Sequence, residues 1–255
     1  MSAGRLAAIY RHPVKGFTPE AVDAVTLTEG EGFPADRVYA IENGPSGFDP
    51  DAPAHVSKMK FTVLARSAVV AKLQTRFDEA SGQFHITDEA GETRAFSLRD
   101  AAGRDRLADY LASSFGEAFP GPLKVLEAPG AFRFSDHHLG HVSLLNLASV
   151  DAVSQAFGRE VEASRFRMNL VFDGLSAWEE DEWAEGDILK LGEAELRVFK
   201  PTVRCRATHA SPDGQGYDLD TVPLLHKHFG RNTLGLYAHV AKTGIVRVGD
   251  RLERA

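Results

Sequence analysis

The chain holds a single cysteine, Cys205, in the stretch KPTVRCRATH, where it stands between Arg204 and Arg206. A lone cysteine is most often a small buried residue without a chemical role. Neighbouring cations favour the thiolate, the form that attacks electrophiles and binds metal ions. If residues 203–207 are extended, however, period-two alternation turns both arginines away from the sulfur and makes their effect on it modest. These residues alone leave the inert and the reactive interpretation equally open.

Four further polar residues lie in loops or at strand ends and are bracketed by apolar neighbours: Lys15, Arg37, Arg167 and Asn169. Taken singly, each is typical of a solvated side chain at the end of a strand. Taken together, they could converge on a phosphorylated or pterin-like ligand, because guanidinium groups bind phosphate through paired hydrogen bonds.

Histidines offer a competing metal site, since imidazole is a zinc ligand. Six of them occur near one another or near the cysteine in sequence: His137, His138, His141, His209, His226 and His228. Their spacing matches no HExxH pair, and no CxxC partner exists. Satisfied or exposed histidines are the simpler interpretation, and a zinc hydrolase stays open as a further function. No GxSxG, Walker or dinucleotide-binding motif is present.

The overall composition narrows the class of protein. A formal net charge of −7 over 255 residues argues against general binding to nucleic acid or anionic membranes, because no global positive field attracts phosphates. One cysteine excludes an internal disulfide, which fits a reducing cytoplasm. The N-terminus becomes charged too soon for a signal peptide, and no apolar run approaches the ~18 residues of a membrane span. We therefore expect a cytoplasmic protein.

Many short strand-like runs and few helical ones predict an α+β, predominantly β fold, a barrel-like architecture with helices at its ends. Leu107, Tyr110 and Leu111 predict an amphipathic helix over residues 100–116. Residues 141–158 read as a strand that runs into a helix with Ser149 as its N-cap. A short helix is expected to end at Gly230.

Turn residues place the hairpins. Turns are expected at 79–83, at 88–92 and at 192–193, and two closing strands should join at 243–244. The acidic run WEEDEW at 178–183 is expected to be a solvated turn above its two tryptophans. The turn-rich segment 117–141 is expected to hold the junction between two halves.

An ordered set of segments resembles the MOSC family, and more closely its members with a MOSC N-terminal β-barrel domain, the group that contains the mitochondrial amidoxime-reducing component. The segments are IYRHPVKGF, ADRVYAI, FSDHHLGHVSLLNLAS, FRMNLVFDG, FKPTVRCRATHASPDGQG and GIVRVGDRLE. The resemblance implies a MOSC N-terminal β-barrel domain at 1–118. It also implies a MOSC domain at 119–255, a β-barrel with flanking helices.

The resemblance also assigns site residues. In that family the cysteine of the RC pair ligates molybdenum, which the dithiolene of molybdopterin also holds, and the matching residue is Cys205. The remaining matches are a catalytic Asp136 and the cofactor-binding residues Lys15, Arg37, His138, His141, Arg167, Asn169 and Arg204. The chain departs from the family pattern at Gly16, where relatives have Ser, at Met168, where they have Pro, and at Thr202, where close relatives often have another Cys.

The implied function is that of a molybdenum-cofactor oxidoreductase that reduces small N-hydroxylated compounds such as amidoximes and hydroxylamines. No cysteine-rich ferredoxin domain follows, so the electrons are expected from a separate protein of ferredoxin, flavoprotein or cytochrome b5 type. The alternative is a sulfur-carrier or cofactor-binding protein that uses a Cys205 persulfide and carries out no reductase turnover.

Overall fold

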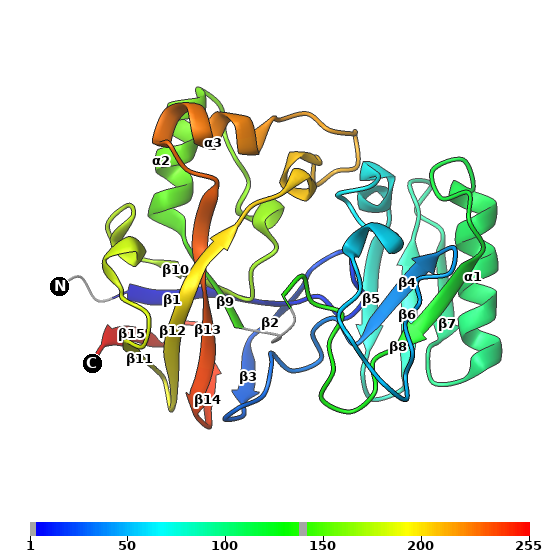
Figure 1. Ribbon diagram of the computed structural model, residues 1–255, viewed down its shortest axis with the longest axis horizontal. Coiled ribbons are helices and arrows are strands. Elements are labelled where there is room, and N and C mark those ends of the chain that lie inside the picture. The colour runs from blue at the N-terminus through cyan, green and yellow to red at the C-terminus, as the bar shows by residue number, and fades with distance from the viewer. Residues whose placement is uncertain (1–3, 138–141) are drawn as a thin grey trace.

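The computed structural model describes residues 4–137 and 142–255, and its dominant feature is a closed barrel (Figure 1). Seven strands form the ring, in the order β10 (Leu170–Asp173), β9 (Val142–Asn146), β13 (Thr233–Lys242), β12 (Ala194–Val203), β11 (Ile188–Leu191), β15 (Arg251–Arg254) and β1 (Gly4–Arg11). The N-terminal strand β1 closes the ring, because it pairs antiparallel with both β15 and β10. Strands β9 and β10 pair in parallel. The predicted predominantly β fold with a barrel is confirmed.

The inside of the barrel is an aliphatic core. Alternate residues of β11 and β12, among them Leu189, Leu191, Leu196 and Val198, are buried and pack in one cluster. This is the period-two pattern expected of strands with one face on a core. Two short strands extend the architecture: β2 (Glu20–Val22) pairs with β1, and β3 (Ala24–Leu27) pairs with β14 (Gly244–Arg247).

The second part of the molecule is built from two small sheets and a helix, at the right of Figure 1. Strands β5 (Gln74–Asp78), β6 (Gln83–Thr87) and β7 (Thr93–Ser97) form a meander, and β4 (Tyr39–Asn43) pairs with β8 (Leu123–Glu127). Helix α1 (Ala101–Phe115) buries Leu107 and Leu111 against them and is capped by Asp100, whose side chain accepts from the Gly103 N–H at 2.7 Å. The predicted helix and both predicted hairpin turns of this part are confirmed.

Helices α2 (Leu147–Phe157) and α3 (Thr221–Phe229) pack beside the barrel at its upper end in Figure 1. Helix α3 ends at Gly230, which has a left-handed φ of 65°, so that prediction is confirmed. The predicted N-cap Ser149 is wrong. Asn146 caps α2 by accepting from the Ala148 N–H, whereas the hydroxyl of Ser149 is buried and donates to Glu180.

In the described residues, short 3-10 turns connect these elements: η1 (Lys58–Lys60), η2 (Ala68–Lys72), η3 (Ala163–Phe166), η4 (Glu179–Glu182) and η5 (Arg206–His209). The acidic run forms the expected turn with Asp181 and Glu182 exposed, but Glu180 departs from the expectation because it is buried and accepts hydrogen bonds from Asn146 and Ser149. Two closing strands were expected, but the end of the chain forms three, β13, β14 and β15. Strand β14 pairs with β3 outside the barrel, whereas β13 and β15 belong to the barrel ring.

The two parts of the molecule do not separate at one point of the chain. Residues 4–27 lie with the barrel although they precede the smaller sheets, and β8 lies with those sheets although it follows residue 118. The division into domains at 1–118 and 119–255 stays a prediction.

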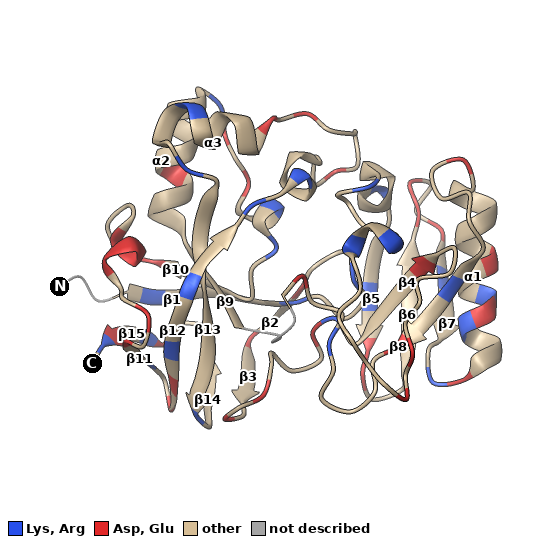
Figure 2. Cartoon of the chain, in the orientation of Figure 1, with Lys and Arg blue, Asp and Glu red and all other residues tan. Residues whose placement is uncertain are grey.

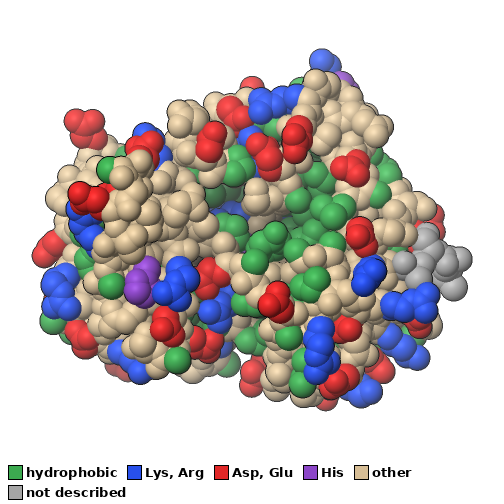
Figure 3. Space-filling view, turned by 180° about the vertical axis from the view of Figure 1, so that it is seen from behind, with side chains coloured by type: hydrophobic (Ala, Val, Ile, Leu, Met, Phe, Trp, Pro, Cys, Tyr) green, Lys and Arg blue, Asp and Glu red, His purple; other side chains and the backbone are tan. Residues whose placement is uncertain are grey.

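The surface shows no continuous positive patch on the face seen from behind, where charged side chains of both signs surround a central group of hydrophobic ones (Figure 3). No helix in the described ranges is long and apolar enough to span a bilayer.

Candidate active site

A cavity of about 300 Å³ lies where the barrel faces the smaller sheets, a size at the lower end of the range for small-molecule sites. Its described lining carries cations from both parts of the molecule. Backbone segments coloured blue for Lys and Arg occur in both parts on the sides that face each other (Figure 2). These cations are Lys15, Arg37, Lys58, Arg165, Arg167, Lys200 and Arg204. Asp136 is the one carboxylate among the described lining residues. Such a cavity is suited to an anionic ligand.

Cys205 lies in the wall of this cavity, directly after β12. The extended run ends at Cys205, where η5 begins, and the hydroxyl of Thr208 donates to the Cys205 carbonyl at 2.9 Å. The condition of an extended run over residues 203–207 is therefore met only as far as Cys205. The two flanking arginines differ: Arg204 is buried in the cavity wall, whereas Arg206 is exposed and stacks on Tyr217 at 4.0 Å.

The cation closest to the sulfur comes from elsewhere in the chain. Lys58 Nζ donates to Cys205 Sγ at 3.2 Å and to Asp136 Oδ2 at 2.9 Å. The other oxygen of Asp136 accepts from Lys15 Nζ at 2.6 Å, and Lys15 also donates to the Phe134 carbonyl at 2.7 Å. Asp136 thus links two lysines in front of the thiol.

These contacts set the charge states. Burial opposes the ionised form of Asp136, but the charges of Lys15 and Lys58 outweigh it and hold the pKa of that carboxyl far below its usual range. Burial likewise disfavours the ammonium of Lys58, yet Asp136 and Cys205 raise the pKa of that amine. For Lys15 burial dominates, and its pKa is lowered despite Asp136.

Arg37 and Arg167 are held in unusual backbone conformations. Both have φ of 53°, in the left-handed region that non-glycine residues seldom adopt. Arg37 is paired with Asp36, and its Nη2 donates to the Arg167 carbonyl at 3.3 Å. His12 supports Asp36, which accepts from the His12 backbone N–H at 2.7 Å. Such strain is maintained where the surrounding structure fixes it, and it gathers at functional sites.

Among the residues that the structure describes, two guanidinium groups in the cavity keep buried N–H groups without a partner, Arg167 at Nη2 and Arg204 at Nε. Burial and the neighbouring charge of Arg37 lower the pKa of Arg167 to about 9. A buried donor without a partner is costly, and a buried cation near another cation more so. An anion placed between these arginines would relieve both costs, so the site is suited to a phosphate group.

Comparison with known proteins identifies the family. The profile described as MOSC domain matches residues 132–253. The profile described as MOSC N-terminal beta barrel domain matches residues 3–117. The chain belongs to the MOSC family.

Curated relatives agree with this assignment. The Xenopus laevis protein named mitochondrial amidoxime-reducing component 1 is 30% identical over 186 residues, which cover 61% of this chain and 53% of the relative. The Bos taurus protein named mitochondrial amidoxime reducing component 2 is 31% identical over 121 residues, 43% of this chain and 35% of the relative. The human component 1 is 29% identical over 119 residues, 42% of this chain and 34% of the relative. The matched segments thus span about a third to a half of these relatives.

Solved structures give weaker similarities. The YUAD protein from Bacillus subtilis aligns over 99% of this chain and 97% of its own, with a TM-score of 0.46 and 10% identity. YiiM from Geobacillus stearothermophilus aligns over 45% of this chain and 53% of its own, with a TM-score of 0.34 and 24% identity.

The MOSC cavity brings together most of the residues that the sequence singled out. Six of them line it: Lys15, Arg37, Asp136, Arg167, Arg204 and Cys205. Asn169 is buried behind the wall and ties strands together, since its Oδ1 accepts from the Ser143 hydroxyl at 2.8 Å and its Nδ2 donates to the Tyr10 carbonyl at 3.1 Å. His138 and His141 lie outside the described residues. The roles assigned to these residues stay predictions.

Other cavity residues were missed by sequence reasoning. Lys58 follows a polar loop, and Lys200 and Tyr237 belong to β12 and β13, which lie side by side at the cavity. A lysine next to a polar loop is normally solvated, so no spacing marked Lys58. Lys200 shares its sequence stretch with the RC pair, which could have marked it, whereas Tyr237 reaches the site only because β13 pairs with β12 and sets it opposite Lys200.

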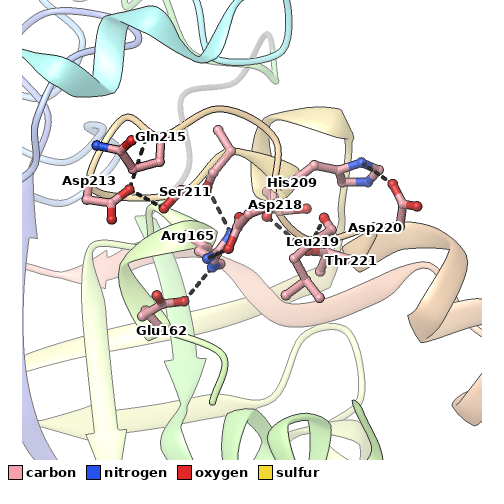
Figure 4. Close-up of polar contacts among 12 residues, drawn as sticks. Glu162, Arg165, His209, Ser211, Asp213, Gln215, Asp218, Leu219, Asp220 and Thr221 are labelled. Atoms are coloured by element: carbon pink, nitrogen blue, oxygen red, sulfur yellow. Dashed lines mark hydrogen bonds and ion pairs between the residues drawn. The ribbon is translucent and has the colours of Figure 1, made fainter. Parts of the chain in front are cut away.

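Arg165 was also missed, and it secures one wall of the MOSC cavity (Figure 4). Its guanidinium is buried and donates to both oxygens of Asp218, at 2.7 and 2.9 Å, and to the Ala210 carbonyl at 3.0 Å. Glu162 pairs with the same group. This network fastens η3, and with it Arg167, to the segment that follows Cys205.

Within the described part of the chain, no group of three or more histidine, cysteine and carboxylate side chains is placed to hold a metal ion. His137 contacts Lys200 Nζ through Nε2 at 2.8 Å, and His209 lies 3.5 Å from Asp220. The described histidines therefore give a zinc hydrolase no support.

Proposed function

We propose that this MOSC protein is a molybdenum-cofactor oxidoreductase that reduces small N-hydroxylated compounds, such as amidoximes and hydroxylamines, to the nitrogen base. One observation carries the proposal: the chain's single thiol lies in the wall of a cavity lined by cations, two of which keep buried N–H groups that have no partner within residues 4–137 and 142–255. The names of the curated relatives favour the reductase among the activities that such a site can support.

The residues present fit a molybdopterin cofactor. Arg167 and Arg204 would bind its phosphate, because their unpartnered donors are the groups that an anion would satisfy. Lys15 and Arg37 would add positive charge. The thiolate of Cys205 is a soft ligand, which suits a metal that dithiolene sulfurs also bind. When bound, the molybdenum would supply the oxygen-atom chemistry.

The reaction fixes what the protein must deliver. Reduction of R–NHOH to R–NH2 and water breaks the N–O bond and consumes two electrons and two protons. The electrons would come from a separate electron-transfer protein of ferredoxin, flavoprotein or cytochrome b5 type. Asp136 stays ionised between its two lysines, and it would orient the substrate nitrogen by accepting a hydrogen bond from it. The protons would enter from solvent through the open side of the cavity.

The test is elemental analysis of protein made in a host that synthesises the cofactor. Wild-type protein should hold about one molybdenum per chain, and Cys205→Ser should lose both molybdenum and reductase activity. Arg206→Lys is the matched control, since Arg206 is adjacent in sequence but stacks on Tyr217 outside the cavity. Equal molybdenum in wild type and Cys205→Ser would refute the assignment.

The sulfur-carrier alternative rests on the partial exposure of Cys205 and on the ammonium of Lys58 beside it. A persulfide at Cys205 would be an anion, and Lys58 would stabilise it. Mass spectrometry that finds the persulfide on molybdenum-free protein, together with no reductase activity after loading, would favour this alternative.

A further inference from the structure

Lys58 reaches the reactive thiol from the opposite part of the molecule. Its ammonium lies 3.2 Å from Cys205 Sγ and 2.9 Å from Asp136 Oδ2, and its side chain is 29% exposed. Lys58 belongs to η1 in the segment between β4 and β5, whereas Cys205 follows a strand of the barrel. The contact therefore joins two elements that are 147 residues apart in sequence.

The backbone at Lys58 is held firmly on both sides. Ser57 caps the turn by accepting from the Met59 N–H, and the Phe61 N–H donates to the Lys58 carbonyl at 3.1 Å. Arg66 Nη1 donates to the Met59 carbonyl at 3.1 Å. A loop that merely exposes charge to water does not need these hydrogen bonds.

An aromatic cluster sets the position of η1 relative to the site. Phe61 is buried and meets the ring of Phe134 edge-on, with centroids 5.6 Å apart. Phe134 is two residues before Asp136, and Ala207, two residues after Cys205, packs against the same cluster. One hydrophobic contact set thus fixes the three segments that carry Lys58, Asp136 and Cys205.

The neighbouring lysine of the same turn behaves differently. Lys60 is exposed, whereas Lys58 is turned into the cavity. The two lysines have the same charge and lie in the same 3-10 turn, so they form a matched pair in which only one touches the sulfur.

We propose that Lys58 is a positioning residue that donates a hydrogen bond to the metal-bound sulfur of Cys205 and thereby raises the reduction potential of the bound molybdenum. This inference rests on the proposed function. A hydrogen bond and a positive charge at a ligating sulfur withdraw electron density from the metal, which stabilises the reduced state that carries more negative charge. Asp136 keeps the ammonium in place by binding it on the other side.

The test is a redox titration of the molybdenum-loaded full chain, followed by the molybdenum EPR signal and preceded by metal analysis and circular dichroism. Lys58→Met should have a lower reduction potential than wild type. Lys58→Arg keeps the charge and the donors, and Lys60→Met removes a charge that does not touch the sulfur. Both should remain close to wild type. Lys58→Gln, which keeps a neutral N–H donor, should lie between wild type and Lys58→Met.

Each outcome decides a separate question. Wild-type protein without molybdenum would refute the proposed function, and this inference with it. Molybdenum in wild type and in Lys58→Met with equal potentials would overturn the role of Lys58 alone. A folded Lys58→Met that fails to bind molybdenum would also overturn it, since Lys58 would then retain the cofactor rather than tune it. If Lys58→Met does not fold, Lys58→Gln decides by the same comparison.

Discussion

At the scale of single residues, the cavity separates cations that already have a carboxylate from cations that do not. Lys15 and Lys58 share Asp136, and Arg37 is paired with Asp36. Arg167 and Arg204 retain N–H groups that find no partner in the described part of the chain. These ion pairs reduce the repulsion between the cations of the cavity. The two arginines without a carboxylate partner among the described residues mark where a ligand must add negative charge.

His12 should make the stability of the protein depend on pH. Burial, followed by the charges of Arg167 and Arg37, lowers its pKa to about 3, against an ordinary value of about 6.5. Below pH 6.5 the unfolded chain binds this proton and the folded chain does not, so stability falls as pH falls toward 3. Because of His12, the unfolding free energy should be about 2 kcal/mol lower at pH 5 than at pH 7.5.

Urea unfolding at pH 7.5 and pH 5 checks this expectation. His12→Gln should show a smaller loss of stability between the two pH values than wild type does. His55→Gln is the control, because His55 is exposed, and it should keep the wild-type difference. Equal losses in His12→Gln and wild type would contradict the expectation.

Gly16 should not accept a serine, the residue that the family resemblance implies at this position. Its φ is 93°, and an added Cβ would lie 2.5 Å from the carbonyl oxygen of Thr62. Gly16→Ser therefore combines backbone strain with a steric clash against backbone, and it should lower the unfolding free energy by about 2–4 kcal/mol.

The control for Gly16→Ser is Gly47→Ser. Gly47 also has positive φ, 82°, but nothing lies within 4 Å of an added Cβ. The unfolding free energy of Gly47→Ser should therefore fall only by the backbone strain, about 1 kcal/mol. Urea denaturation of both variants gives the difference, and equal losses would show that Thr62 moves aside at no cost.

At the scale of elements, the site depends on loops that the barrel and the smaller sheets hold from opposite sides. The segment after β12 is fastened near its far end, just before α3, to both parts of the molecule: Arg165 binds Asp218, and the adjacent Tyr217 donates its hydroxyl to the Leu64 carbonyl at 2.7 Å. The second contact ties the barrel to the other part of the molecule. Cys205 thus begins a segment whose far end is tied to both parts of the molecule.

Arg165→Lys should weaken this fastening. A lysine cannot form the paired hydrogen bonds that Arg165 makes with Asp218, and it would leave buried acceptors unsatisfied. We expect a loss of about 2 kcal/mol in unfolding free energy and faster amide hydrogen exchange in residues 206–218.

Arg159→Lys provides a matched comparison, because Arg159 binds the same carboxylate at 2.9 Å but is 44% exposed. An exposed pair contributes about 0.5 kcal/mol, so exchange in residues 206–218 should stay near the wild-type rate. Similar exchange in both variants would mean that burial of Arg165 is not what fastens the segment.

Much of the secondary structure could be predicted from the sequence. The periodicity of Leu107 and Leu111 predicted α1, and the turns at 79–83 and 88–92 predicted the meander, because local patterns determine local structure. Ser149 was taken for a cap because capping residues were judged by type alone. Its hydroxyl instead meets Glu180, a tertiary contact that no local pattern reveals.

Only part of the site could be predicted, because tertiary contacts leave no local pattern in the sequence. Cys205, Lys15 and the arginines stood out through residue type and through resemblance to a family. Lys58 did not, because its role arises from the packing of Phe61 on Phe134, which brings distant segments together. Asn169 is predicted to contact a ligand, yet in the structure its side chain hydrogen-bonds to Ser143 and Tyr10 and holds strands together.

At the scale of the whole molecule, the path of the chain joins the two parts more closely than their order in sequence indicates. Strand β1 is the first element and also the last member of the barrel ring, since it fills the gap between β10 and β15. Strand β8 follows α1 but completes the sheet of β4. Each part therefore contains a strand from the other side of residue 118.

A fragment of residues 119–255 should consequently fail to fold alone. Without β1, strands β10 and β15 become open edges, and Leu6 and Ile9 no longer fill the barrel core, in which they are fully buried. Exposed edges and an incomplete core favour aggregation.

The control joins residues 1–28 to residues 132–255 through a flexible glycine-serine linker, which restores β1 and omits β8. Near-ultraviolet circular dichroism and urea unfolding should show a cooperative transition for the joined chain and none for the fragment. A cooperative transition in the fragment would instead mean that the remaining six strands close without β1, and that residue 118 is a true boundary between folding units.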